Sequence, residues 1–292
     1  MIGRIVTALF CAAIALSCAA APIQATSGDT LTVGVPTDRC PVFYRDADTG
    51  EVTGIGVDLM RTAAEKAGYA VTFKAIGEET LKQALDNEAY NIIMPFGSAI
   101  ASASGRSSVV SDNLTQTPFT LVTENNGELP PLNELRVGML HSLSGAAETV
   151  RLLYPGIEIT LYETMSESVK ALRADEVDAL LHNSYVWSYV LQKPAYSDLT
   201  VQPSAMFSMD FRAGALDTPS GQAMIARLNG GIAALTDTRR QAVVLDHTSR
   251  RLYRYDLSDY LYEYGLVLLL GTLLFASLVI ISVMKWVVSQ SC

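Results

Sequence analysis

The stretch LTVGV at residues 31–35 decides the fold, because it returns as LRVGM at residues 135–139. A second stretch, ALDNEAYNII at residues 84–93, returns in the same order as ALRADEVDAL at residues 171–180. The first pattern indicates a buried strand that ends in a loop. The second indicates the end of an amphipathic helix, a polar turn and another apolar strand. Strands that alternate with helices predict parallel α/β sheets, and the repeated order predicts two similar lobes.

The segments around these repeats complete the expected organisation. Helical patterns cover residues 57–67 and 145–153, and later residues 220–234 and 238–245, while residues 206–213 read as a further strand. A linker-like stretch at residues 124–131 is where we expect the chain to cross first between the lobes. The segment after residue 207 is expected to return to the first lobe. The prediction is lobe 1 at about 30–122 and 208–250, and lobe 2 at about 123–207, within a domain of residues 26–250.

The N-terminus reads as an export signal of residues 1–25. Arg4 precedes an apolar stretch from Ile5 to Ala21, and small residues offer cleavage sites near Ala20 or after Ala25. Acylation of Cys18 is the alternative, but Ala15 stands where lipoprotein sites prefer leucine. Either interpretation places the folded domain outside the cytoplasm.

The C-terminal run of residues 265–284 carries no charged side chain and is long enough to cross a bilayer. Tyr262, Tyr264 and Trp286 bracket it, and Lys285 follows at once, as is typical of a membrane-spanning helix. A buried core helix is the competing interpretation. We therefore predict a juxtamembrane linker at 251–264, a transmembrane helix at 265–284 and a cytoplasmic tail at 285–292.

Composition excludes several classes of function. The formal net charge is −9 and no block of Lys and Arg occurs, so nucleic acid is not an expected partner. Cys40 is the one cysteine between the predicted signal and the predicted membrane helix, so no disulfide framework is expected there. His141 and His182 are expected near the cleft between the lobes, but no third ligand accompanies them, so no metal or other cofactor is predicted.

The order of several short elements resembles the family 3 extracellular solute-binding proteins, which include the amino-acid-binding proteins of ABC importers. LTVGV at 31–35 is followed by PVFY at 41–44 and by GEVTGIGVDL at 50–59, which is close to the family element G-x-x-x-G-F-D-V-D-L. Residues 84–95, 137–139 and 177–181 continue the resemblance. It implies a two-lobed periplasmic-binding-protein (Venus flytrap) fold of the α/β class, with a small-molecule ligand held between the lobes. The C-terminal transmembrane helix predicted from hydropathy is added to this fold.

The resemblance also implies a set of ligand-binding residues. Arg106 matches the family's carboxylate-binding arginine, whose planar guanidinium grips a carboxylate with two donors. The same comparison places the following residues at the ligand: Tyr44, Ser98, Ser142, Ser144 and Asn183. Ser142 and Ser144 open a helix, where they add donors or simply cap it. Asn183 stands where the family has an acid for the α-ammonium group, which argues against a plain α-amino acid.

Three functions are consistent with these features. The predicted continuity from the returning lobe into the membrane favours a ligand sensor, and DLSDYLYEY at residues 256–264 resembles the corresponding segment of sensor kinases and diguanylate cyclases. Because residues 285–292 hold no catalytic domain, either the output lies on a partner protein or the chain is a truncated relative of such a sensor. The alternative is the receptor component of an ABC importer, delivering solute to a permease. An enzyme is a remote third possibility, because the sequence offers no catalytic residues at motif spacing.

Overall fold

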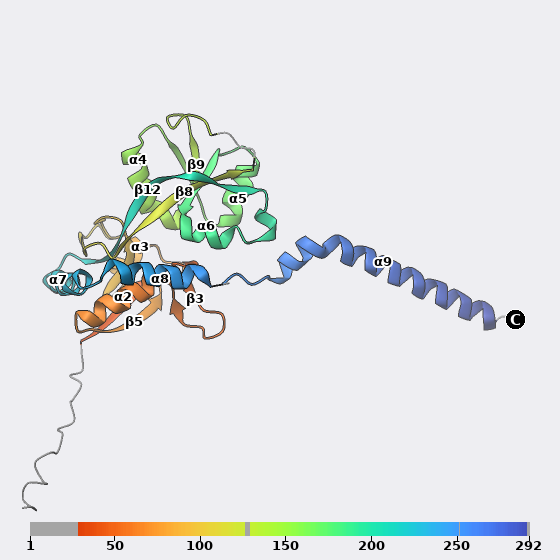
Figure 1. Ribbon diagram of the computed structural model, residues 1–292, viewed down its shortest axis with the longest axis horizontal. Helices are drawn as coiled ribbons and strands as arrows, with labels where there is room; N and C mark the ends of the chain where they lie inside the picture. The colour runs from red at the N-terminus through yellow and green to blue at the C-terminus, as the bar shows by residue number, and fades with distance from the viewer. Residues whose placement is uncertain (1–28, 126–128, 251, 291–292) are drawn as a thin grey trace, which may run out of the picture.

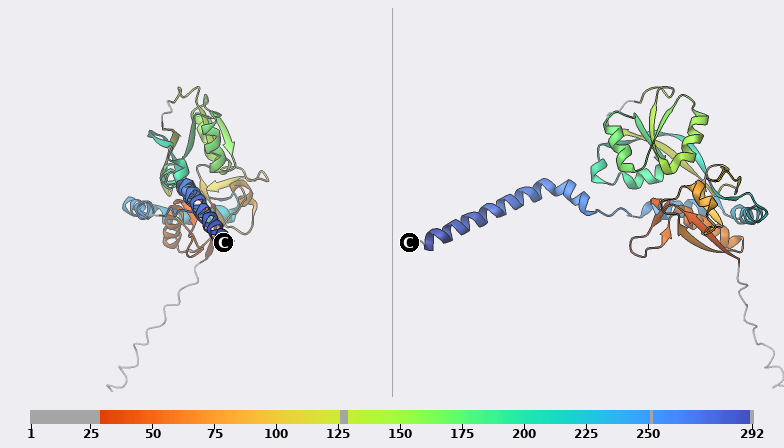
Figure 2. Two further views of the ribbon diagram at one scale, coloured as in Figure 1. Left: turned by 90° about the vertical axis from the view of Figure 1, so that its right-hand side faces the viewer. Right: turned by 180° about the vertical axis from the view of Figure 1, so that it is seen from behind.

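The computed structural model describes residues 29–125, 129–250 and 252–290, with the side chains of residues 203–207 left out. The predicted signal at 1–25 lies outside these residues. The described chain forms two α/β lobes and a long helix that extends away from them (Figures 1 and 2). The two-lobed α/β architecture expected from the internal repeat is thus confirmed.

The first lobe contains the N-terminal half of the chain and two helices that return to it. Its main sheet is built from β1 (Thr30–Val35), β5 (Ala70–Ala75), β6 (Ile92–Phe96) and β7 (Ser108–Val110). A small separate sheet consists of β2 (Asp38–Arg39), β3 (Phe43–Arg45) and β4 (Val52–Thr53). Its helices are α2 (Ile55–Lys66), α3 (Leu81–Asp86), α7 (Pro219–Ala233) and α8 (Asp237–Ser249).

The second lobe repeats this plan. Its strands are β8 (Thr115–Glu124), β9 (Arg136–Leu140), β10 (Glu158–Tyr162) and β11 (Ala179–Asn183). Its helical elements are the 3₁₀ turn η1 (His141–Leu143), α4 (Ser144–Leu153), α5 (Met165–Arg173), α6 (Ser184–Val190) and the turn η2 (Pro194–Tyr196). Strand β12 (Leu199–Leu216) runs through both lobes, and α9 (Leu257–Gln290) ends the described chain. The strands and helices predicted by the repeats are confirmed.

Two polar side chains show why the repeat folds twice in the same way. Asn91 and Asp178 occupy matching positions just before β6 and β11. The Asn91 side-chain oxygen accepts from the Thr32 N–H at 2.7 Å, and the Asp178 carboxylate accepts from the Arg136 N–H at 2.8 Å. Each bond ties the incoming strand to the strand that precedes it in the repeat, β1 or β9. Asn91 is therefore structural, as expected from its position at the start of a strand.

The glycines of the repeated strands lie under matching side chains of the two lobes. A Cβ atom on Gly34 would lie 2.7 Å from Ile93 Cδ1, and one on Gly138 would lie 2.6 Å from Leu180 Cδ2. Ile93 belongs to β6 and Leu180 to β11, so matching side chains fill the same space in each lobe. A larger residue at either glycine would require these side chains to shift.

The sheet is continuous from one lobe to the other, and its strand pairing places the boundary between the lobes earlier in the chain than expected. Its strand order is β10-β9-β11-β8-β12-β6-β1-β5. Strand β8 pairs with β11, and Phe119 and Leu121 lie in the core cluster of the second lobe. The chain therefore crosses before β8, near residues 111–115, rather than at residues 124–131. The expected boundary at residue 122 falls inside β8, because the hydrophobic run of this strand belongs to the second core.

Helix α9 is 34 residues long and is the one helix of the described chain that is long and apolar enough to cross a membrane. At 1.5 Å per residue it measures about 51 Å, more than a hydrocarbon core of about 30 Å requires. It begins at Leu257, inside the stretch expected as a linker. The first turns therefore extend the helix beyond the predicted span of 265–284.

A hydrogen bond between a histidine and a carboxylate inside the first lobe predicts a pH-dependent stability. The His247 ring on α8 is buried, and its Nε2 lies 2.8 Å from Asp58 Oδ2 on α2. This hydrogen bond holds the pKa of Asp58 below its ordinary value, although burial opposes the shift. A carboxyl group whose pKa is lowered by folding stabilises the folded state above its unfolded pKa. That stabilisation is lost as the pH falls through the folded pKa.

Asp58→Asn is accordingly expected to lower the free energy of unfolding by about 1 kcal/mol at neutral pH, since one charged hydrogen bond is lost at a partly exposed site. The difference from the wild type should shrink as the pH falls below about 4. Urea unfolding at a series of pH values measures it, with Glu65→Gln on the exposed side of the same helix as the control. A difference that does not change with pH would contradict the assignment.

Candidate functional site

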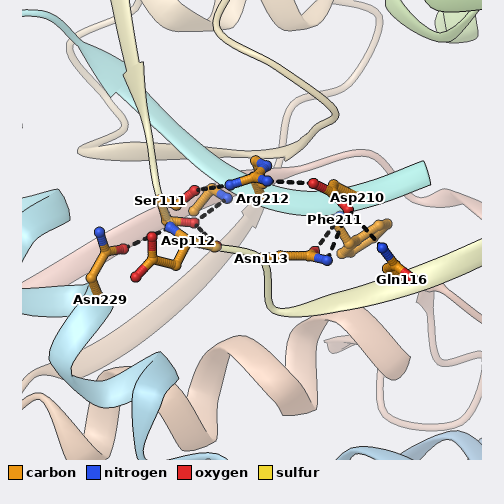
Figure 3. Close-up of polar contacts among 9 residues, drawn as sticks. Ser111, Asp112, Asn113, Gln116, Asp210, Phe211, Arg212 and Asn229 are labelled. Atoms are coloured by element: carbon orange, nitrogen blue, oxygen red, sulfur yellow. Dashed lines mark hydrogen bonds and ion pairs between the residues drawn. The ribbon is translucent and has the colours of Figure 1, made fainter. Parts of the chain in front are cut away.

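Two short crossing segments join the lobes and form a hinge held by side-chain hydrogen bonds (Figure 3). Asp210 on β12 accepts from the amides of Asn113 at 2.9 Å and Gln116 at 3.3 Å, and it also pairs with Arg212. Arg212 donates in addition to the Ser111 carbonyl at 3.0 Å. Two strands allow rotation of one lobe against the other, and these bonds keep the two strands in register.

A buried arginine of the first lobe reaches across to the second. Arg39 is the last residue of β2, in the small sheet that follows β1 along the chain, and is 6% exposed. Its Nη2 donates to the Ser142 carbonyl at 2.8 Å, at the turn that opens α4. Its Nε lies 3.5 Å from Asp38 Oδ1 but has no hydrogen-bond partner among the described residues. Burial lowers the pKa of Arg39, while the charge of Asp38 opposes that effect.

A buried histidine of the second lobe lies near this contact. His182 is 2% exposed at the end of β11, and its Nδ1 accepts from the Asn183 N–H at 2.7 Å. The proton of the neutral ring is therefore on Nε2, which has no hydrogen-bond partner among the described residues. Burial lowers the pKa of His182 to about 3, and the charge of Arg39 contributes. The ring is neutral at physiological pH and offers one unsatisfied N–H donor.

A cavity of about 510 Å³ opens between the lobes, lined by Asp38 and Cys40 on either side of Arg39 in the chain but not by Arg39 or His182 themselves. The first lobe contributes Tyr44 and the loop around Asp38 and Cys40, and the second contributes Val186 and Tyr189 of α6. Leu252 and Arg254, which precede α9, also line it. Burial raises the pKa of the Cys40 thiol to about 12, so this side chain is a neutral part of the wall. The cavity is large enough for a small organic ligand.

The predicted ligand residues fall into two groups in the structure. Tyr44 lines the cavity, and the Ser142 carbonyl accepts from Arg39 of the opposite lobe, while Ser144 is the first residue of α4 and Asn183 is the buried last residue of β11. Ser98 is exposed in the loop after β6. Arg106 lies on the first lobe, where its Nη2 and Nε contact Asp86 Oδ1 at 2.7 and 3.0 Å.

Two predicted residues already serve the protein itself. The guanidinium of Arg106 is about half exposed and is engaged by Asp86, whose pKa is lowered by Ser104 and Arg106. The Asn183 side-chain oxygen accepts from the Tyr185 N–H at 2.9 Å and caps α6. This role explains why an amide is tolerated at position 183, because a helix cap needs a hydrogen-bond acceptor and not a negative charge.

Sequence reasoning missed Arg39. The available signal was its position directly after the first strand, in the loop that faces the second lobe in a fold of this class. Arg106 was preferred because it matched the family by position along the chain. His182 was expected near the cleft, but the lack of a hydrogen-bond partner for its Nε2 among the described residues depends on its burial in the folded chain and is invisible in the sequence.

Two α/β lobes joined by two strands, with buried donors and a cavity between them, define a bilobed solute-binding protein. The chain belongs to the bacterial extracellular solute-binding proteins, family 3, whose profile matches residues 31–246. The expected family and fold class are thereby confirmed.

Individual relatives are distant. A glutamine-binding protein of Geobacillus stearothermophilus is 24% identical over 174 residues, which span 57% of this chain and 66% of that protein. Among solved structures, the periplasmic VFT2 domain of BvgS from Bordetella pertussis gives a TM-score of 0.59 at 14% identity, covering 75% of this chain and 93% of that one. An arginine transport system periplasmic binding protein from Legionella pneumophila gives 0.57 at 14% identity, covering 75% and 99%. These structural likenesses establish the fold.

Proposed function

We propose that this protein is a membrane-anchored receptor that binds a small carboxylate-bearing solute between its lobes, outside the cytoplasm. The observation that carries the proposal is a pair of buried N–H groups, Arg39 Nε from one lobe and His182 Nε2 from the other, that have no hydrogen-bond partner among the described residues. An unsatisfied buried donor costs about 1–3 kcal/mol, and a carboxylate that accepts from both would remove this cost. Closure of the lobes would then be favoured by the ligand.

The ligand class follows from the groups available. A guanidinium and a neutral imidazole provide donors for a carboxylate, as in recognition by charge-assisted hydrogen bonds. The relatives named above for glutamine and arginine support an amino-acid-like ligand. Asn183 provides no negative charge for an α-ammonium group, so we propose an amino-acid derivative or an organic acid in preference to a plain α-amino acid.

Sensing is the proposed role. Leu252 and Arg254 line the cavity between the lobes and are followed within a few residues by α9. A ligand in this cavity would lie against the segment that enters the membrane. Delivery of solute to an ABC importer is the second candidate, supported by the transport protein of Legionella pneumophila among the structural relatives. In either role the partner is a membrane protein, a signalling output protein or a permease.

A thermal-shift screen of the full-length protein in lipid nanodiscs tests the binding. A library of organic acids and amino-acid derivatives is expected to contain compounds that raise the melting temperature. At a hundred times its dissociation constant, a ligand stabilises the folded state by about 2.7 kcal/mol. For each hit, the matched primary amide or methyl ester should have lost most of the shift. Equal shifts by acid and ester would contradict a carboxylate site.

A further inference from the structure

Helix α6 touches both lobes at the cleft. It begins directly after His182 and Asn183. The Trp187 ring on this helix packs edge-on against the His182 ring, with the ring centroids 6.1 Å apart. Val186, although it belongs to the second lobe, is 2% exposed within the core cluster of the first lobe. A side chain buried against the opposite lobe must change its surroundings when the lobes separate. Helix α6 is therefore the part of the second lobe that registers closure most directly.

The other end of α6 holds the start of α9. The Tyr189 ring meets the Tyr253 ring edge to face, with centroids 5.4 Å apart. The Tyr253 hydroxyl donates to Asp259 Oδ2 at 2.5 Å, and Asp259 is 1% exposed. The chain from α6 to α9 thus runs through two packed rings and one buried hydrogen bond.

The first turn of α9 is rigid. The Asp256 N–H donates to Asp259 Oδ2 at 3.0 Å, and the Asp259 N–H donates to Asp256 Oδ1 at 2.9 Å. Such reciprocal bonds satisfy the free N–H groups at a helix start and fix the direction of the entering chain. The turn η2 of the second lobe also lies against α9. The hydrogen bonds of Asp259 thus connect Tyr253 to the first turn of α9.

The first lobe holds the same segment only at the surface. Arg254 pairs with Asp48 at 2.8 Å, and both side chains are about two thirds exposed. A pair of this kind contributes little, because solvent screens it. The chain therefore leaves α8 in the first lobe, while the start of α9 is held chiefly by the second.

From these contacts we infer that α6 transmits lobe closure to α9, with Tyr189, Tyr253 and Asp259 as positioning residues. The inference rests on the proposed receptor function, since it names the route by which that receptor signals. Rotation of the second lobe about the hinge carries α6, Tyr253 and the first turn of α9 together relative to the first lobe. The physical requirement is one continuous set of packed groups between the cleft and the membrane helix.

Hydrogen exchange of the full-length protein in lipid nanodiscs, without any ligand, tests this route. Tyr253→Phe should increase exchange in residues 257–264 about three- to tenfold, the effect of one lost hydrogen bond. Val186→Ala, about one turn before Tyr189 on α6, should increase exchange in the same peptide, and it should do so only while Tyr189 is present. In a Tyr189→Ala background, Val186→Ala should add nothing. Tyr262→Phe, with an exposed ring, is the matched control and should leave exchange unchanged.

The outcomes separate clearly. An unchanged peptide 257–264 in Val186→Ala, or an increase that persists without Tyr189, overturns the inference. Protection of β1 and β6 must remain at the wild-type level, which shows that the first lobe is intact in each variant. Because no ligand is used, coupling found together with a failed ligand screen would overturn only the proposed function. Binding found without coupling would overturn only the route through α6.

Discussion

Replacing Arg39 with methionine is expected to weaken ligand binding by about thirtyfold or more while leaving the unliganded protein as stable as the wild type or more so. Truncating one partner of a buried, hydrogen-bonded charge pair costs about 2–5 kcal/mol of binding, which is about thirtyfold or more in affinity. The unliganded protein gains because a buried guanidinium with an unsatisfied Nε is replaced by an apolar side chain of similar length. A substitution that lowers the affinity for the ligand without lowering the stability of the unliganded protein identifies a residue that serves binding and not folding.

Arg106→Met is the matched comparison, because it removes the arginine that sequence position favoured. Its guanidinium lies on the surface with Asp86, so the affinity should change by less than about threefold. Isothermal titration with a ligand from the screen, together with the melting temperature without ligand, measures both variants. Retained affinity in Arg39→Met and lost affinity in Arg106→Met would reverse the assignment and restore the prediction from the sequence.

Trp187→Ala is expected to cause the largest loss of stability of the substitutions considered. Trp187 is 1% exposed in a core cluster with Val122, Val169 and Leu180, and its Nε1 donates to the Thr120 carbonyl at 3.0 Å. Truncating a buried tryptophan creates a cavity and costs about 3–5 kcal/mol. Chemical unfolding followed by circular dichroism measures the loss of stability. Because the Trp187 ring packs against the His182 ring, the same variant should also leave the His182 side chain less firmly held.

Trp187→Phe serves as the control, since it keeps most of the apolar volume and loses the N–H. It should cost about 1–2 kcal/mol, near the value of one buried hydrogen bond. Comparable losses for alanine and phenylalanine would mean that the hydrogen bond dominates over packing. A loss below about 1 kcal/mol for alanine would show that the second lobe refills the space, contrary to the packing described.

Much of the fold follows from local patterns. The strands beginning at Leu31 and Leu135, and the turns before Ile92 and Ala179, are encoded by short-range hydrophobic periodicity, which a sequence displays directly. The boundary between the lobes was placed wrongly, at residues 124–131. A polar linker with two prolines resembles a domain crossing, whereas the true crossing near residue 112 contains ordinary polar residues that form the hinge only after β8 and β12 have paired.

The candidate site was harder to predict, because it depends on which polar side chains are buried away from water on folding without gaining a hydrogen-bond partner in the protein. Arg106 and Arg39 are equally plausible carboxylate receptors on paper. In the folded chain Arg106 meets Asp86, while Arg39 is buried between the lobes. Asn183 was expected to bind the ligand at the cleft, whereas in the structure its amide caps α6. That use depends on a helix start that the sequence alone did not reveal.

The sequence by itself determined two α/β lobes and an apolar C-terminal helix, because these depend on periodicity and composition within short windows. The tertiary structure decided which donors are left unsatisfied in the cleft and how α9 is attached. Arg39 and His182 lie 143 positions apart in the chain, and Tyr189 and Tyr253 lie 64 apart. Contacts across such separations form only when the lobes have folded and met, because burial and hydrogen bonding are properties of the assembled chain and not of any segment.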